Sequence, residues 1–212
     1  MDFLEKDLQD YVEMHTASES DLLHKINRET HLEVLKPRML SGHLQGRVLS
    51  MISHMIAPRN ILEIGTYTGY SALCMAEGLQ DGGKLITIDI NSELEPRVKG
   101  YFKDSGFGSK IEMLIGDARE IIPTLDYPWD LIFVDADKAS YSDYFDLTID
   151  QLRPGGFMLV DNVLWSGKVF DKNKTDKATV SVRAFNEKVN QDVRVENVLF
   201  PIRDGLMVLR KK

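Results

Sequence analysis

The stretch NILEIGTYTGYSAL, residues 60–73, decides the fold. It opens with a short apolar run, passes through a turn that contains Gly65 and Gly69, and continues as an amphipathic segment of helical length. A glycine turn between a strand and a helix brings backbone N–H groups close to a ligand. The stretch therefore has the order strand, turn, helix.

That order continues to the end of the chain. Further apolar runs are KLITIDI (84–90), IEMLIG (111–116), DLIFVDA (130–136), GGFMLVD (155–161), VRVENVLFP (193–201) and GLMVLRK (205–211). Helical stretches are predicted at about residues 69–80, 91–106, 117–126, 140–152 and 177–190. Such alternation predicts an α/β fold, with a mostly parallel seven-stranded sheet and helices on both faces. Only the short turn IRDG separates the last two runs, so the last strand is expected to be antiparallel.

Before residue 58 the pattern is helical. Leu44, Val48 and Ile52 recur on one helical face, and Pro37 and Pro58 are expected to end helices. The sequence therefore predicts one domain over residues 1–212, made of a helical N-terminal extension (1–57) and an α/β core (58–212).

Composition excludes several classes of protein. The net charge is −7, which argues against a general nucleic-acid binder. A single cysteine, Cys74, excludes an internal disulfide framework. The acidic N-terminus lacks the apolar region of a signal peptide, and no apolar stretch is long enough to cross a bilayer. A cytoplasmic protein that makes no use of a membrane is expected.

The turn after the first strand has the spacing Gly65-x-x-x-Gly69, which differs from the dinucleotide pattern G-x-G-x-x-G. Glu63 just before it suits a ligand with a cationic group, and Ser71 can donate to a carboxylate. An amino-acid moiety carries both charges.

Other polar residues follow the next two strands, at the sheet edge where open α/β sheets bind ligands. Asp89 is placed to accept the two ribose hydroxyls of a nucleoside, and Asp117 and Ala118 to frame an adenine edge. These features together predict an adenosine site, with a purely structural role as the alternative.

Acidic residues gather after the fourth and fifth strands. Asp135 ends one apolar run, and Asp161 and Asn162 follow the next run 26 residues later. If the two strands are neighbours, three oxygen ligands converge, which suits a hard divalent cation: Mg²⁺ first, with Mn²⁺ or Ca²⁺ as alternatives. The competing interpretation is that these acids cap the helices that follow.

Lys138 is the candidate base. All five histidines precede residue 60, so none follows a strand of the core. An ammonium beside a metal cation is destabilised, which favours a neutral amine that can accept a proton. The alternative is an exposed lysine at a helix start.

These motifs together resemble the cation-dependent S-adenosylmethionine O-methyltransferases of the caffeoyl-CoA and catechol type. LEIGTYTGYSAL, FVDADK, VDNVLWSG and IRDGLMVLRKK match that family in order and spacing, from about residue 37 to the end. The resemblance implies a Rossmann-like class I methyltransferase fold, a homodimer, and residue roles that can be carried over. It assigns Asp135, Asp161 and Asn162 to the metal, Lys138 and Asp135 to catalysis, Trp165 and Ser166 to the acceptor, and Met39, Ser41, Glu63, Gly65, Thr66, Ser71, Asp89, Ala118, Asp135 and Asp137 to S-adenosylmethionine.

The sequence departs from the plant enzymes at residues 39–49. In the plant enzymes an acidic pair precedes the glycine that aligns with Gly46, whereas this chain has Leu44 and Gln45 at those two positions. The N-terminal segment, which shapes the acceptor pocket in the family, matches least.

The leading functional hypothesis is methyl transfer to a hydroxyl of a catechol-like or hydroxycinnamoyl-type small phenol. An alternative with the same chemistry is a tRNA 5-hydroxyuridine O-methyltransferase, for which the basic residues of 25–60 and Lys168, Lys172, Lys174 and Lys177 would meet phosphates. An alternative of another class is a non-catalytic adenosine- or NAD-binding module.

The polar stretch SGKVFDKNKTDK, residues 166–177, is predicted to be a loop that is mobile until the acceptor binds.

Overall fold

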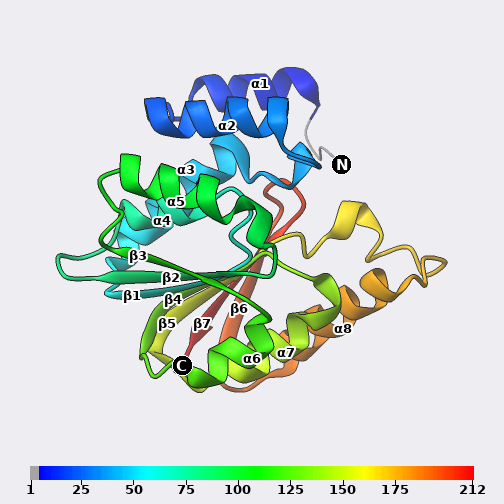
Figure 1. Cartoon of the computed structure of the whole chain (residues 1–212). Helices are drawn as coiled ribbons and strands as arrows, with labels where there is room; N and C mark the ends of the chain where they lie inside the picture. Colours follow the sequence, from blue (N-terminus) through cyan, green and yellow to red (C-terminus); the bar gives the residue numbers. More distant parts are fainter. Residues whose placement is uncertain (1–4) are drawn as a thin grey trace. The chain divides into compact units, whose positions relative to one another are not determined.

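The apolar runs form strands and the amphipathic segments between them form helices (Figure 1). The structure is a computed structural model that describes residues 5–212, so the first four residues of the predicted extension lie outside it. The helices are α1 Lys6–Met14, α2 Asp21–Glu33, α3 Gly42–Ile56, α4 Tyr70–Ala76, α5 Glu95–Asp104, α6 Ala118–Ile121, α7 Tyr141–Thr148 and α8 Lys177–Gln191. The strands are β1 Asn60–Ile64, β2 Lys84–Asp89, β3 Ile111–Ile115, β4 Trp129–Val134, β5 Leu152–Val160, β6 Val195–Phe200 and β7 Leu206–Lys211.

The predicted sheet is confirmed. Seven strands form one sheet in the order β3-β2-β1-β4-β5-β7-β6. β1, β2 and β3 pair in parallel, as do β4 and β5, whereas β7 is antiparallel to both β5 and β6. This is the mostly parallel α/β fold with an antiparallel last strand that the spacing of the runs predicts.

The chain divides into two compact units, and the described part of the first is residues 5–117. It contains α1 to α5 and β1 to β3. Here α3 packs along α4, and α2 contacts α4 and α5 (Figure 1). Both expected helix ends are confirmed, since α2 ends at Glu33 before Pro37, and α3 ends at Ile56 before Pro58.

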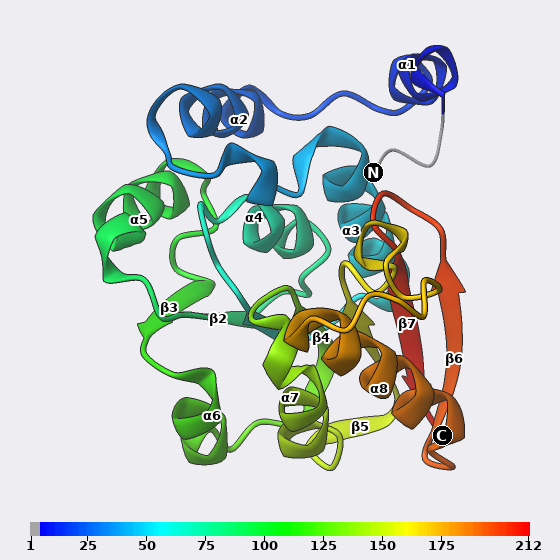
Figure 2. The same cartoon turned by 90° about the vertical axis from the view of Figure 1, so that its right-hand side faces the viewer.

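The second unit is residues 118–212 and contains α6 to α8 and β4 to β7. Figure 2 shows α7 and α8 side by side, and the two helices are in contact. Phe185 of α8 packs edge-on against Tyr141 and Phe145 of α7, with ring centroids 5.5 and 6.5 Å apart. This aromatic cluster fixes α7, whose first residue lies beside the ends of β4 and β5.

Four predicted helices are shorter than expected, among them α7, which is predicted at about residues 140–152 and covers Tyr141–Thr148. α4 ends at Ala76, because Gly78 packs directly on the backbone of α3: a Cβ there would lie 2.3 Å from the Ser53 carbonyl carbon. α5 begins at Glu95, because residues 92–94 form a 3-10 turn. α6 ends at Ile121, where another such turn begins that has Pro123 as its second residue. Among residues 5–212, no helix is both long and apolar enough to cross a membrane.

Candidate active site

The predicted site residues fall into two sets, one in each unit. In the first unit, the turn after β1 has an unusual backbone: Gly65, Tyr67 and Gly69 all have positive φ, at 103°, 47° and 77°. Glycine is required at position 69, because a Cβ there would also lie 2.7 Å from the Phe102 ring. The turn is therefore held open by backbone geometry that the glycines supply.

Glu63 lies beneath this turn and is fully buried. Its carboxylate accepts hydrogen bonds from the Ser71 hydroxyl and the Thr87 hydroxyl, each at 2.5 Å. Thr66 and Thr87 are joined by their hydroxyl oxygens at 2.5 Å. Because Thr87 donates its one proton to Glu63, Thr66 must be the donor in that pair. Three predicted cofactor residues thus share one buried network through Thr87.

Asp89 ends β2 at the same turn. One of its carboxylate oxygens accepts the Tyr67 backbone N–H at 2.7 Å, and the other accepts the Asn91 N–H at 2.8 Å. Each carboxylate oxygen has a second lone pair, so Asp89 can accept further hydrogen bonds from a ligand. Its placement fits the predicted contact with ribose hydroxyls.

The residues before and within α3 complete the first set. Met39 is half exposed, whereas Ser41 and Gln45 are buried. Ser41 precedes the first residue of α3 as its N-cap. Gln45 replaces an acidic residue of the plant enzymes, and its burial without a charge costs less than burial of a carboxylate.

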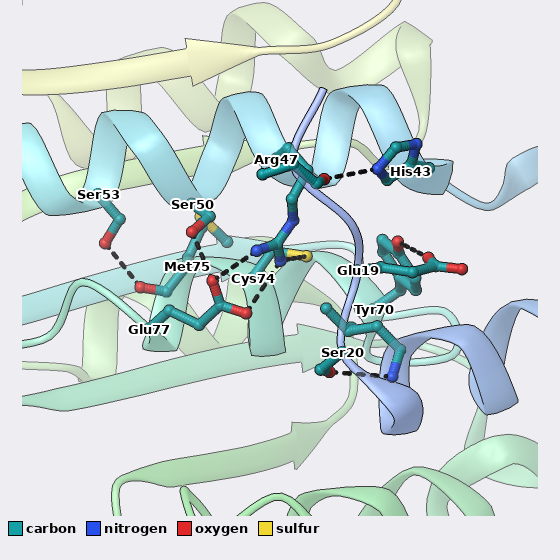
Figure 3. A network of polar contacts seen from close by, with 12 residues as sticks. Glu19, Ser20, His43, Arg47, Ser50, Ser53, Tyr70, Cys74, Met75 and Glu77 are labelled. Carbon is teal, nitrogen blue, oxygen red and sulfur yellow. Dashed lines mark hydrogen bonds and ion pairs between the residues drawn. The ribbon is translucent and has the colours of Figure 1, made fainter. Parts of the chain in front are cut away.

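A polar network joins α3 to α4 (Figure 3). Arg47 forms a bidentate ion pair with Glu77, at 2.9 and 3.0 Å, and the Ser50 hydroxyl donates to the same carboxylate at 2.5 Å. Gly46 lets the helices approach closely, since a Cβ there would lie 2.6 Å from the Tyr70 ring. The first residues of α3 and α4 therefore have a fixed separation, which sets Ser41 relative to the glycine turn.

This network also contains Cys74, which burial keeps inert. The thiol is fully buried, and burial raises its pKa to about 12 despite the nearby Arg47 guanidinium.

The Tyr70 hydroxyl donates to the Glu19 carboxylate in the segment between α1 and α2, and His43 bonds the Ala17 carbonyl oxygen of that segment at 2.8 Å. The N-terminal segment is thus tied to the helices that flank the turn.

In the second unit, the acidic pair lies where the spacing predicted. Val134 and Val160 are partners in the parallel pair β4–β5, and the Asp161 N–H donates to the Val134 carbonyl oxygen at 3.0 Å. Asp135 and Asp161 follow these residues directly, so they occupy adjacent strand ends about 4.8 Å apart. Asp161 is only 2% exposed, and its carboxylate accepts the Asn162 N–H at 2.7 Å.

Lys138 contacts Asp135, the first member of this pair. Its Nζ lies 2.7 Å from the Asp135 carboxylate, and both side chains are largely buried. The nearby Tyr141 hydroxyl donates to the Asp161 carbonyl oxygen at 2.7 Å. Burial raises the pKa of Tyr141 well above its ordinary value, and the charges of Asp135 and Asp161 raise it further. Tyr141 is therefore a neutral donor that holds the Asp161 backbone.

The remaining predicted residues of this unit lie on α6 and in the segments that follow β4 and β5. Asp137 precedes a 3-10 turn and accepts the Ser140 hydroxyl at 3.0 Å. Ala118 is the buried first residue of α6. Trp165 and Ser166 follow β5, and the Ser166 N–H donates to the Asp204 carboxylate at 2.5 Å.

The donor set fits a hard divalent cation. Two adjacent carboxylates carry more negative charge than the single ammonium of Lys138 neutralises, and all three predicted ligands offer oxygen. Asn162 has φ 59°, a conformation that asparagine tolerates better than most residues. Across residues 5–212 no group of three or more His, Cys, Asp and Glu side chains is arranged for a metal; the predicted set instead uses two Asp and an Asn.

Sequence reasoning missed two residues that shape these sets, Thr87 and Tyr141. Thr87 lies in the middle of the run KLITIDI, where a lone threonine looks like an ordinary strand residue. Tyr141 starts a helix three residues after Lys138, a position that gave some signal of its proximity to the strand ends.

Comparison with known proteins identifies the family. The model of the O-methyltransferase family matches residues 13–212. A catechol O-methyltransferase from Niastella koreensis is 35% identical over 72% of this chain and 71% of its own. A caffeoyl-CoA O-methyltransferase from Stellaria longipes is 30% identical over 91% of this chain and 84% of its own.

A solved structure agrees. The O-methyltransferase TomG from Streptomyces achromogenes, which is involved in tomaymycin synthesis and was solved in complex with S-adenosylmethionine, has 29% sequence identity to this chain. It superposes with a TM-score of 0.89 over 97% of this chain and 96% of its own. The chain therefore belongs to the O-methyltransferase family, the S-adenosylmethionine-dependent enzymes of the catechol and caffeoyl-CoA type.

Proposed function

We propose that the protein transfers a methyl group from S-adenosylmethionine to a phenolic hydroxyl of a catechol-like or hydroxycinnamoyl-type acceptor, and that it needs a divalent cation. The observation that carries the cation requirement is the pairing of Asp135 and Asp161 at registered strand ends, with Asn162 next in the chain. Carboxylate and amide oxygens are the ligands that Mg²⁺ and Mn²⁺ prefer.

The first set of residues suits the cofactor. The Glu63 network gives the glycine turn a buried negative charge, which favours a ligand with a cationic amino group. Asp89 has lone pairs for ribose hydroxyls. We assign to the same ligand, as proposals, the further residues Met39, Ser41, Gly65, Thr66, Ser71, Ala118, Asp135 and Asp137.

The second set suits proton removal and acceptor placement. A cation bound by Asp135, Asp161 and Asn162 would favour ionisation of an acceptor hydroxyl and orient two vicinal oxygens. The Nζ of Lys138 lies 2.7 Å from the Asp135 carboxylate. We propose that Lys138 is the residue placed to accept the proton of the acceptor hydroxyl. Trp165 and Ser166 are proposed to border the aromatic ring.

A small phenol is favoured because the named relatives act on catechol or caffeoyl-CoA. The tRNA alternative keeps the same chemistry and rests only on basic residues, among them Lys168 and Lys172. Family membership leaves the non-catalytic adenosine or NAD module without support. A cytoplasmic location, a homodimer and a single functional domain stay predictions.

Calorimetric titration of Mg²⁺ and Mn²⁺ tests the cation site independently of the acceptor. The wild-type protein is expected to bind, and Asp161→Asn is expected to lose binding while its affinity for S-adenosylmethionine is unchanged. Asp146→Asn is the matched control, since Asp146 is an exposed carboxylate of the same unit that pairs with Lys188. Equal cation binding by wild type and Asp161→Asn would remove Asp161 from the site. A methyl-transfer panel of catechol, caffeoyl-CoA and hypomodified tRNA then identifies the acceptor class.

A further inference from the structure

The segment that carries Trp165 has a backbone that few residues adopt. Asn162, Trp165 and Ser166 have φ values of 59°, 48° and 52°, all in the left-handed region. Residues other than glycine are uncommon in this region, and the conformation persists only where the surrounding structure holds it. Contacts outside the segment must therefore impose this conformation on residues 162–166.

One set of contacts comes from the turn between β6 and β7. The Val163 N–H donates to the Gly205 carbonyl oxygen at 3.1 Å, and the Leu164 N–H donates to the Asp204 carbonyl oxygen at 2.8 Å. The Asp204 carboxylate accepts the Ser166 N–H. These bonds hold the start of the segment.

The other set comes from α8, and Arg183 is its centre. Its Nε donates to the Val169 carbonyl oxygen at 2.7 Å, and one terminal nitrogen donates to the carbonyl oxygens of Lys168, at 2.9 Å, and Asp171. One turn further along the helix, the Asn186 amide donates to the Val163 carbonyl oxygen at 2.9 Å. One guanidinium therefore closes residues 168–171 onto α8.

Lys168, in the segment that Arg183 holds, places its side-chain cation over the Trp165 ring. The Nζ of Lys168 lies 5.6 Å from the Trp165 ring centroid, and the Nζ of Lys138 lies 5.9 Å from it. Both distances are within the range of a cation–π interaction. The indole N–H is buried and has no hydrogen-bond partner within residues 5–212, so ring packing and these two cations set its orientation.

We propose that Arg183 is a positioning residue for acceptor binding: it holds residues 168–171 and thereby fixes Trp165 in the orientation that receives the aromatic ring. This inference rests on the proposed role of Trp165 at the acceptor. The contacts of Arg183 lie in the first half of the stretch 166–177, at the carbonyl oxygens of residues 168, 169 and 171. Mobility of residues 166–177 until the acceptor binds stays a prediction.

Arginine suits this task better than lysine. The planar guanidinium presents several N–H donors in a fixed fork, so one side chain can serve three carbonyl oxygens. A lysine ammonium is a compact charge on a flexible chain and can replace only part of these bonds. Arg183→Met is thus expected to release the segment, and Arg183→Lys to release it partially.

Tryptophan fluorescence reports the effect without acceptor or cofactor. The chain has two tryptophans, and Trp129 is fully buried, so acrylamide quenching reports mainly on Trp165. The protein with Trp165→Phe gives the contribution of Trp129 alone. Quenching of Trp165 is expected to rise in Arg183→Met, to rise less in Arg183→Lys, and to stay at the wild-type value in Lys188→Met. The last variant is the control, because it removes a cation of α8 that pairs with Asp146.

Kinetics complete the test. In Arg183→Met the KM for the phenolic acceptor is expected to rise about tenfold, the effect of about 1.4 kcal/mol, while the affinity for S-adenosylmethionine is unchanged. A merely structural role would lower the thermal midpoint and leave both quenching and acceptor KM unchanged.

Unchanged Trp165 quenching in Arg183→Met would overturn the inference even if the protein proves to be a phenol methyltransferase. Increased quenching with an unchanged acceptor KM would overturn the link to the acceptor. Quenching needs no acceptor, and an acceptor KM can be measured only if the protein methylates that acceptor, so both results are distinct from a failure of the proposed function itself.

Discussion

Thr87→Val removes one hydroxyl from the buried network beneath the glycine turn. Valine has nearly the shape of threonine, so the change leaves no cavity. Thr87 is fully buried, and its hydroxyl joins Glu63 and Thr66, each at 2.5 Å. The variant therefore leaves the Glu63 carboxylate with one bond fewer and the Thr66 hydroxyl without its acceptor.

The two lost hydrogen bonds set the magnitude. A bond to a charged group contributes about 1.5–3 kcal/mol and a neutral one about 0.5–1.5 kcal/mol, so the expected loss of unfolding free energy is about 2–4.5 kcal/mol. For a chain of this length each kcal/mol lowers the thermal midpoint by about 2–4 °C, which predicts a fall of about 4–18 °C. Affinity for S-adenosylmethionine is expected to fall too, because Glu63 also orients Ser71.

Urea unfolding and calorimetric titration of S-adenosylmethionine measure the two effects. Thr148→Val is the matched control: Thr148 is equally buried, but its hydroxyl donates to a backbone carbonyl oxygen within α7 at 2.7 Å. Its expected loss is about 0.5–1.5 kcal/mol, the value of a neutral hydrogen bond, with cofactor affinity unchanged. If Thr87→Val and Thr148→Val lost the same free energy and neither changed cofactor affinity, the network would have no special role.

Two further predictions concern the α3–α4 network. Arg47→Met should lower the unfolding free energy by about 1–3 kcal/mol, between the values for exposed and buried ion pairs; Glu77→Gln added to it should cost much less than Glu77→Gln alone, which a double-mutant cycle in urea measures. Cys74 should resist iodoacetamide at pH 8 in the native protein and react in urea, because burial raises its pKa to about 12. Since its folded pKa lies above its ordinary 9.0, the stability it contributes is complete below pH 9.0 and is lost as the pH rises through about 12.

Local patterns predicted the fold closely because parallel strands in such a sheet are continuous apolar runs. The run NILEI was predicted as a strand and forms β1 without change. Helix ends were predicted less well, because 3-10 turns at residues 92–94 and 122–124 and the contact of Gly78 with α3 depend on tertiary packing.

The part of the site that depends on the spacing of strands along the chain was predictable. The spacing between Asp135 and Asp161 equals one strand–helix–strand unit, and the register of β4 and β5 confirms their adjacency. Thr87 and Arg183 were not predictable in this way. The partners of Thr87 lie on and after a neighbouring strand, and the acceptors of Arg183 are backbone carbonyl oxygens, which leave no trace in the side-chain pattern.

The measurement that tests the central claim most directly is methyl transfer from S-adenosylmethionine to catechol by protein stripped of metal with EDTA. A divalent cation bound by Asp135 and Asp161 is expected to be required to position the acceptor oxygens. The account predicts that the stripped enzyme is inactive and that added Mg²⁺ or Mn²⁺ restores the activity. Full activity in the presence of excess chelator would contradict it.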